Sequence, residues 1–337
     1  MELVFRWADL SDVADIKQFL AESFGPDAIQ SSSGRFEALF LEHPLGFHVS
    51  LCTVSGSIVG LRCYLPMRAI FSQQELTGAF PVDLMVKPEY RRMGISRQFL
   101  DMAQERFPFT VSSGQSKSQA ALYEENGAAV VATYYKGYLV RRPTLQGTLK
   151  ASIRDVLSWL HRGRKRRLKA SAKIISEIDS TTLNFLTAHR LLDGEVGNLI
   201  AQDTYAWRYS GSYYRDCTAV VVECENRHGI LVYRVTSEET QILDIFCGAD
   251  TLELLISVAS SLLPGRKLSA RFAGERLKFL FATAGFLIRP MDAKLVVHSR
   301  HRQLQERLAQ HNWVIFAGDS DTALLEFPQQ GMVNEIF

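Results

Sequence analysis

The chain has 337 residues, of which 47% are hydrophobic and 22% charged, and its formal net charge is +2. These values are typical of a globular protein of about two domains, and the small net charge gives no reason to expect a nucleic-acid partner. No apolar run reaches the roughly 18 residues of a membrane-spanning helix, and the N-terminus has no signal-peptide core. The five cysteines lack metal-ligand spacing, so we expect free thiols, a cytoplasmic location and no metal site.

Strands and helices alternate in the first 143 residues. Two apolar β segments flank Ser55-Gly56-Ser57, which is a hairpin signal, and Gly127 closes a helix. The predicted strands are 3–6, 49–54, 58–65, 82–86, 109–113 and 129–140, and the predicted helices begin at Asp9, near Ile95 and at Ser116. This order predicts a mixed α/β domain.

The segment Phe80–Leu100 carries the strongest functional signal. An apolar run, Val82–Val86, ends before Pro88, and a basic glycine-containing turn leads into a helix. The turn and the first helical residues present backbone N–H groups that no carbonyl within the helix can accept, and the helix dipole adds partial positive charge. Gly94 allows a close backbone approach. The segment therefore predicts a phosphate or pyrophosphate site.

Arg91-x-x-Gly94-x-Ser96 resembles the Arg/Gln-x-x-Gly-x-Gly/Ala loop of the GNAT family of acyl-CoA-dependent N-acyltransferases. The strand before it and the element Leu122–Ala128, which is similar to the family's Leu-Tyr-x-x-x-Gly-Phe, extend the resemblance over residues 1–143. Ser96 and Ala128 depart from the family pattern. The resemblance implies acetyl-CoA, or another acyl-CoA, as co-substrate. It implies cofactor contacts from Leu84, Val86, Arg91, Arg92, Met93, Gly94, Ile95 and Ser96.

The resemblance also implies catalytic residues. In the family, two central strands diverge and expose a backbone N–H to the thioester oxygen; here these strands would be Val82–Val86 and Phe109–Ser113. The family tyrosine near the sulfur corresponds to Tyr123, the candidate general acid, with core packing as the alternative. Asp83 is the only carboxylate in its apolar run. It is either a base whose pKa burial would raise or a structural partner of an arginine.

A basic amphipathic linker is predicted at 144–170. Apolar residues from Leu149 to Leu160 form one helical stripe, and the basic run 161–169 follows. The segment is a helix docked on a domain, a peripheral contact with an anionic membrane, or, least favoured, a nucleic-acid patch.

The order of the first half returns in residues 171–337. Strands are predicted at 173–178, 218–224, 229–235, 241–246, 268–272 and 295–299, and helices at 251–262 and 275–284. The turn that corresponds to the loop, Cys247–Asp250, has an acid and no arginine, and Asp250 would repel phosphates. The sequence therefore predicts two fused GNAT-like domains, each a mixed, mostly antiparallel sheet flanked by helices, with a cofactor site in the first alone.

The second half offers candidate acceptor contacts. Trp207, Arg208 and Tyr209 combine a guanidinium with two aromatic rings, which can stack on a sugar or grip an anion; the alternative is core packing. Asp319 and Asp321 lie in a Gly-Asp-Ser-Asp turn that could hold an amine or could simply be a turn.

The predicted function is acyl-CoA-dependent N-acyl transfer to a small amine, with an amino sugar in cell-surface polysaccharide assembly as the favoured acceptor. An O-acyl acceptor stays open. One alternative is a non-catalytic protein that keeps the fold for binding or assembly. Another is an aminoacyl-tRNA-dependent transferase, which the intact loop Arg91–Ser96 disfavours.

Overall fold

The computed structural model describes residues 2–26, 28–31, 34–71, 74–113, 117–140, 170–175, 183, 186, 189–210, 217–224 and 227–319. The predicted linker, except for residue 170, and Asp321 lie outside these ranges, as does the side chain of Asp319. No helix in the described ranges is long and apolar enough to cross a bilayer.

The N-terminal half, residues 2–140, contains the predicted strands and helices. Its strands are β1 (Val4–Trp7), β2 (Val49–Val54), β3 (Ser57–Phe71), β4 (Gln74–Val86), β5 (Thr110–Ser112) and β6 (Ala129–Val140). Its helices are α1 (Val13–Phe24), α2 (Ile95–Arg106) and α3 (Lys117–Glu125), with a π-helical turn at Glu37–Leu41.

The C-terminal half, residues 170–319, repeats much of this order. Its strands are β7 (Ala170–Ile174), β8 (Glu195–Asn198), β9 (Cys217–Cys224), β10 (Arg227–Val235), β11 (Thr240–Phe246), β12 (Lys267–Ala273), β13 (Leu287–His298) and β14 (Asn312–Phe316). Its helices are α6 (Gln202–Tyr205), α7 (Leu252–Leu262), α8 (Glu275–Thr283) and α9 (Arg302–Gln310). A second π-helical turn, Ala206–Ser210, follows α6. The predicted mixed α/β class is confirmed.

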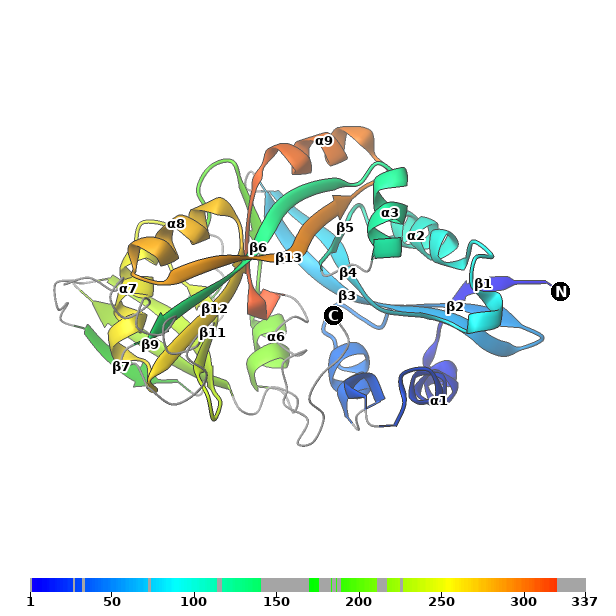
Figure 1. The fold of residues 1–337 in the computed structure, drawn as a ribbon, viewed down its shortest axis with the longest axis horizontal. Coiled ribbons are helices and arrows are strands. Elements are labelled where there is room, and N and C mark those ends of the chain that lie inside the picture. The colour runs from blue at the N-terminus through cyan, green and yellow to red at the C-terminus, as the bar shows by residue number, and fades with distance from the viewer. Residues whose placement is uncertain are drawn as a thin grey trace, which may run out of the picture.

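The two halves share one sheet because β6 and β13 each run through both of them. The strand order is β1-β2-β3-β4-β5-β13-β6-β12-β11-β10-β9-β7. The end of β13 pairs with β5 in the N-terminal half, while the end of β6 pairs with β12 in the C-terminal half. Figure 1 shows the two strands crossing at the centre of the arched sheet. Each half therefore depends on a strand that belongs to the other in sequence.

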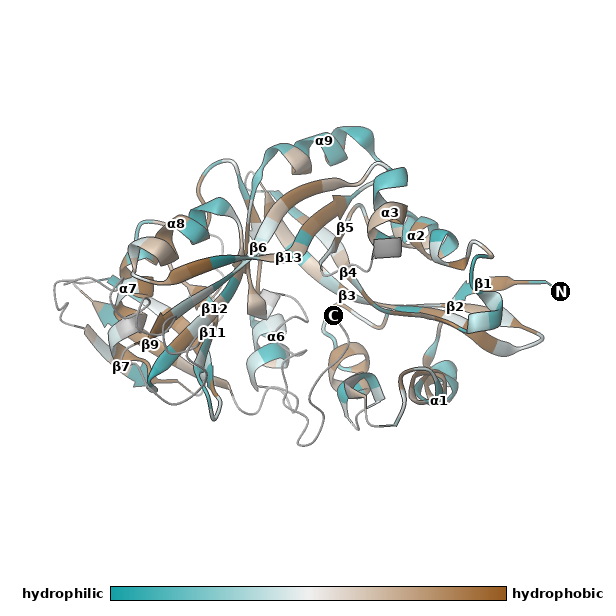
Figure 2. Cartoon of the chain, in the orientation of Figure 1, coloured by the Kyte–Doolittle hydropathy of each residue, from teal (hydrophilic) through white to brown (hydrophobic). Residues whose placement is uncertain are grey.

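The helices cover the two faces of this sheet unequally. In Figure 1, α2, α3, α8 and α9 lie along the outer face, and α1 and α6 lie along the inner one. Hydrophobic residues concentrate on the strands, whereas α9 is mostly hydrophilic (Figure 2) and buries only Leu308. The largest core cluster contains residues of both halves, among them Leu51, Phe109 and Trp313. The halves thus bury apolar surface together, which is the main stabilising contribution to folding.

Candidate functional site

The basic turn after β4 has the backbone geometry of an anion site. A single 3₁₀ turn, Pro88–Tyr90, follows the strand, and Arg92 and Gly94 adopt left-handed φ angles of 65° and 80° before α2 begins. Gly94 is the N-cap of α2, and its own Cα faces open space, since an added Cβ would meet no atom within 4 Å. The first N–H groups of α2 have no partner within the helix. A ligand can therefore reach them directly.

A groove of about 740 Å³ lies over this turn. It runs between the end of β4, the start of α2 and one face of α3. Seven of the eight predicted cofactor residues line it, and Met93, which does not, is 44% exposed. The seven are Leu84, Val86, Arg91, Arg92, Gly94, Ile95 and Ser96, joined by Met85, Tyr90, Arg97, Gln119, Ala121, Leu122 and Glu125. The sequence analysis did not single out Gln119 and Ala121 of α3, because their place beside the turn depends on packing.

The strands beside the groove diverge. β4 and β5 are parallel but pair at only one position, Ala79 with Thr110. β4 also contains a bulge, since Met85 and Val82 pair with Leu61 and Cys63 of β3 and leave two residues of β4 opposite Arg62. One of these is Asp83, whose φ of 47° is left-handed. A bulge bends its strand, and β4 thereby leaves β5, as the resemblance implied.

The side chain of Asp83 is held in a buried ion pair. Its Oδ2 lies 2.6 Å from Nη1 of Arg35, and the two side chains are 6% and 1% exposed. Arg35 also lies over the ring of Phe40, 5.8 Å from its centroid. This carboxylate does not line the groove. Of the two roles that the sequence left open for Asp83, the geometry favours the structural one.

Tyr123 lies beneath the groove rather than in its wall. Its side chain is 2% exposed and packs with Leu100 of α2 and Val296 of β13. Nη2 of Arg62 donates to its hydroxyl over 2.9 Å. The phenol oxygen is thus an acceptor from a buried cation, a partner that the sequence did not suggest because Arg62 lies 61 residues away in another element.

The corresponding gap in the C-terminal half is filled by the chain itself. β11 and β12 pair at three positions, Thr240–Ile242 with Leu268–Ala270, and then part. β14 takes the freed edge of β12 by pairing Phe316 with Phe272. The 3₁₀ turn Ala317–Asp319 follows, and we call Asn312–Asp319 the plug.

The plug is packed too tightly to admit a ligand. A Cβ added at Gly318 would lie 2.1 Å from the Tyr209 hydroxyl and 3.1 Å from the Leu243 carbonyl oxygen. Trp313 of the plug is 1% exposed and packs edge-on against Phe109 of the N-terminal half, with ring centroids 6.4 Å apart. The plug is therefore part of the core.

The turn Cys247–Asp250 differs from the basic turn in charge. A cavity of about 480 Å³ lies beside it and includes Asp250 and Arg227 in its lining. Nη1 of Arg227 donates to the backbone oxygen of Asp250 over 3.1 Å. The guanidinium of Arg227 in β10 therefore lies near this turn. The sequence could not show this contact, because the two segments are brought together by the fold.

The predicted acceptor residues Trp207, Arg208 and Tyr209 are engaged with the protein. Nε1 of Trp207 donates to the carbonyl oxygen of Ala38, and its ring lies 4.3 Å from that of His43. Arg208 is 6% exposed and donates to the carbonyl oxygen of Gly318. The Tyr209 hydroxyl donates to Asp244 over 3.1 Å. These contacts tie the second π-helical turn to the N-terminal half and to the plug, and they favour the packing alternative.

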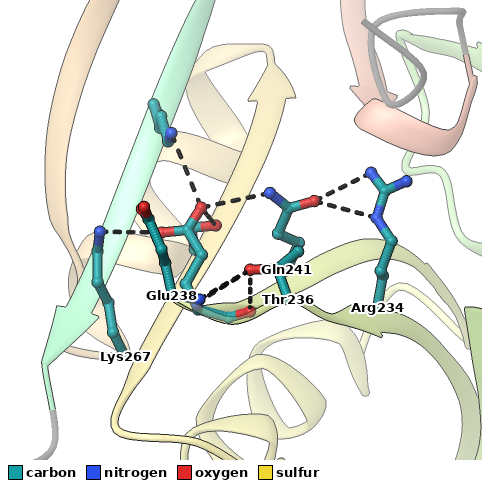
Figure 3. Close-up of polar contacts among 8 residues, drawn as sticks. Arg234, Thr236, Glu238, Gln241 and Lys267 are labelled. Carbon is teal, nitrogen blue, oxygen red and sulfur yellow. Dashed lines mark hydrogen bonds and ion pairs between the residues drawn. The ribbon is translucent and has the colours of Figure 1, made fainter. Parts of the chain in front are cut away.

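A polar network covers part of the C-terminal sheet (Figure 3). Glu239 accepts from Ser269 over 2.8 Å and pairs with Lys267 over 3.0 Å, while Gln241 accepts from Arg234 over 3.0 Å. Burial acts to raise the pKa of Glu239, but the Ser269 hydrogen bond and the lysine charges outweigh it, so the pKa is lowered. The carboxylate is thus held ionised as part of the scaffold.

The described residues contain no group of three or more His, Cys, Asp or Glu side chains placed to hold a metal ion. No protein-family model and no curated protein sequence matches the chain.

Solved structures do match. A protein of Enterococcus faecalis described as a probable N-acyltransferase has a TM-score of 0.61 at 13% identity, over 89% of this chain and 73% of its own. A GCN5-related N-acetyltransferase from Kribbella flavida has a TM-score of 0.58 at 12% identity, over 88% and 70%. The N-myristoyltransferase of Saccharomyces cerevisiae has 0.54 at 10% identity, over 87% and 82%. The chain therefore has the fold of the GCN5-related N-acetyltransferases, the GNAT fold.

Proposed function

We propose that the protein is an acyl-CoA-dependent N-acyltransferase whose cofactor site is the groove at the start of α2. The observation that carries this proposal is the open backbone at Gly94, which joins the N-terminus of α2 to the arginines of the same turn. Pyrophosphate is the part of CoA that this donor set fits. The yeast N-myristoyltransferase, a structural neighbour, was crystallised with myristoyl-CoA bound.

The chain's own groups supply most of what acyl transfer needs. The backbone amides of Met93 to Ser96 and the nearby arginines hold the pyrophosphate, and the cofactor brings the activated thioester. The bulge at Asp83 turns β4 away from β5, so that backbone N–H groups at the gap can face a developing oxyanion. Tyr123 gives a proton to the leaving sulfur. The acceptor is a small amine, with an amino sugar of polysaccharide assembly as the favoured class.

The two halves fit the proposal of a duplicated GNAT unit. Each has a π-helical turn before a hairpin, and each has a pair of parallel strands that part around a gap. We propose that 1–143 carries the cofactor and that 171–337 is a degenerate copy which closes the acceptor side. Residues 149–169 would add a contact with anionic membrane, tested by sedimentation with liposomes that contain phosphatidylserine.

A non-catalytic CoA-binding protein is the second candidate. The observation in its favour is that Tyr123 is buried and Asp83 is paired, and neither side chain is among the residues that line the groove. The two candidates differ in turnover: a binding protein retains CoA affinity and releases no thiol from acetyl-CoA in the presence of amines.

Calorimetry with CoA tests the site. Gly94→Asp places a carboxylate at the closest approach of the phosphates, and a like-charge contact costs several kcal/mol, which corresponds to at least about 100-fold in Kd. Gly94→Asn is the matched control, because asparagine also tolerates a left-handed φ and carries no charge. It should weaken binding less. Equal affinity of wild type and Gly94→Asp would refute the site, and a thiol-release assay with amino sugars and simple amines then tests the reaction.

A further inference from the structure

Arg62 is a buried cation without a counter-ion. It lies in β3 and is 2% exposed, and no carboxylate in the described part of the chain pairs with it. Its Nε is buried without a hydrogen-bond partner, and its guanidinium makes one side-chain hydrogen bond, to Tyr123. A buried charge normally has a partner, because an unpaired one destabilises the fold. Arg35 and Arg190, which are at least as buried, each pair with an aspartate, at 2.6 Å and 2.7 Å, whereas Arg234, also 2% exposed, donates to Gln241.

Tyr123 has a free donor at the same place. Its oxygen accepts the N–H of Arg62, so its hydrogen points elsewhere. Among the described residues no acceptor receives that hydrogen. Two donors of this pair, the Tyr123 hydroxyl and Nε of Arg62, therefore have no acceptor among the described residues, and an electron-rich or anionic atom is the chemistry that satisfies such donors.

The pair lies across the diverging strands. Arg62 belongs to β3 and is opposite the bulge of β4, whereas the Tyr123 ring packs against Val296 of β13. Since the sheet order is β3-β4-β5-β13, a side-chain bridge from β3 to β13 passes over the gap between β4 and β5. This gap is where the groove ends, because Leu84 of the bulge and the adjacent Met85 line it.

We propose that Arg62 is the positioning residue for Tyr123 in acyl transfer, an inference that rests on the proposed function. The amine nitrogen forms a bond to the thioester carbon, the carbon–sulfur bond breaks, and its electron pair stays on sulfur. The Tyr123 hydroxyl gives its proton to that sulfur. The phenolate that remains is stabilised by the guanidinium of Arg62, and the proton lost by the amine returns to it.

The first experiment compares Arg62→Met with wild type in thermal unfolding and in thiol release from acetyl-CoA with glucosamine as the probe amine. Methionine keeps much of the volume and removes the unpaired charge, so the melting temperature should stay or rise. Because a hydrogen bond to a charged group is lost in the transition state, kcat should fall about 10- to 100-fold while the KM for acetyl-CoA is unchanged. Arg62→Lys should retain more activity than Arg62→Met.

The matched control is Arg35→Met. It removes an equally buried arginine but leaves Asp83 unpaired, so its melting temperature should fall. If Arg62→Met lowers the melting temperature as much as Arg35→Met does, Arg62 is a structural residue and the inference is overturned.

A double variant shows whether Arg62 acts through Tyr123. In the Tyr123→Phe background, Arg62→Met should change kcat less than about 2-fold, because residues that act as a unit are not additive. A fall by the full single-variant factor would overturn the inference and leave the proposed function intact. A wild type that binds CoA but releases no thiol with glucosamine or any screened amine would overturn both.

Discussion

The two halves of the molecule each contain a pair of parallel strands that part, and they use the gap in opposite ways. In the N-terminal half, β4 and β5 separate beside a groove of about 740 Å³ that ends at a basic turn. In the C-terminal half, β11 and β12 separate and the plug fills the space. The same sheet geometry thus borders an open groove in one half and a packed core in the other. Whether a half contains a groove or a packed core depends on what fills the gap between its strands, as well as on the charge of the turn.

The largest effect is expected from opening the plug. Trp313→Ala removes a side chain that is 1% exposed and donates to the Leu308 carbonyl oxygen over 3.0 Å. Replacing a buried tryptophan by alanine should lower the free energy of unfolding by about 3–5 kcal/mol. Met93→Ala, at an exposed position, is the control and should have little effect. Denaturant titration measures both, and a second equivalent of CoA bound by the alanine variant would break the comparison.

A smaller loss is expected from the ion pair at the β4 bulge. Asp83→Leu leaves Arg35 buried without its carboxylate, which should cost about 3 kcal/mol, the lower end of the usual range, because Arg35 still lies over Phe40. Adding Arg35→Met should recover most of the loss in denaturant titrations. If Asp83 is a base instead, both variants should lose turnover while the single variant stays stable.

His43, whose ring packs against Trp207 of the second π-helical turn, should make stability depend on pH. Burial, then the charges of Arg208 and His48, lowers the pKa of His43 from 6.5 to about 3. The unfolded chain therefore binds a proton that the folded chain does not bind between these values. The stabilisation that comes from keeping His43 neutral in the folded chain is complete above pH 6.5. It decreases as the pH falls toward 3, and about 2 kcal/mol of it is lost at pH 5.

His43→Asn tests this dependence. The amide oxygen can replace Nδ1, which accepts from the Leu45 amide over 3.1 Å, and it does not titrate. The variant should lose less stability than wild type between pH 7 and pH 5 in thermal unfolding. Parallel curves would assign the acid sensitivity to other groups.

The smallest effect on stability is expected from a charge reversal in the C-terminal turn, and this variant tests the comparison of the two halves most directly. Asp250→Arg gives the C-terminal turn the charge of the basic turn at an exposed position, so stability should change by less than about 0.5 kcal/mol. Because the plug still occupies the gap, calorimetry should find one CoA per chain. Two CoA molecules per chain would show that charge alone distinguishes the two halves.

The sequence predicted those features of the molecule that depend on neighbouring residues. The turn at Arg91–Ser96 and the helix after it follow from local backbone chemistry, and the strands 49–54 and 129–140 match the structure. The sequence could not predict that β6 pairs with β12 and β13 with β5, because strand propensity does not identify a pairing partner far along the chain. The last strand was predicted at 295–299, whereas β13 begins at Leu287, since exposed residues interrupt its apolar pattern.

The candidate site likewise contains features that could be predicted from the sequence and features that could not. The resemblance implied seven of the residues that line the groove, but the partners of Asp83 and Tyr123 were not predicted. Arg35 and Arg62 lie in different elements and reach these side chains through the fold. The sequence predicted a turn at the end of the plug, but the position of the plug between β11 and β12 depends on tertiary contacts.

The pairing of β13 with β5 has a consequence for the synthesis of the protein on the ribosome. Ser112 of β5 pairs with Val296 of β13, so roughly 180 residues must be translated before β5 gains this neighbour, which takes about 10–40 s at ~5–20 residues per second. During that interval the nascent N-terminal half carries an open strand edge on β5, the kind of edge that invites aggregation. Chaperone capture would protect this chain, and cutting its gene at the linker would leave two fragments that each lack a strand.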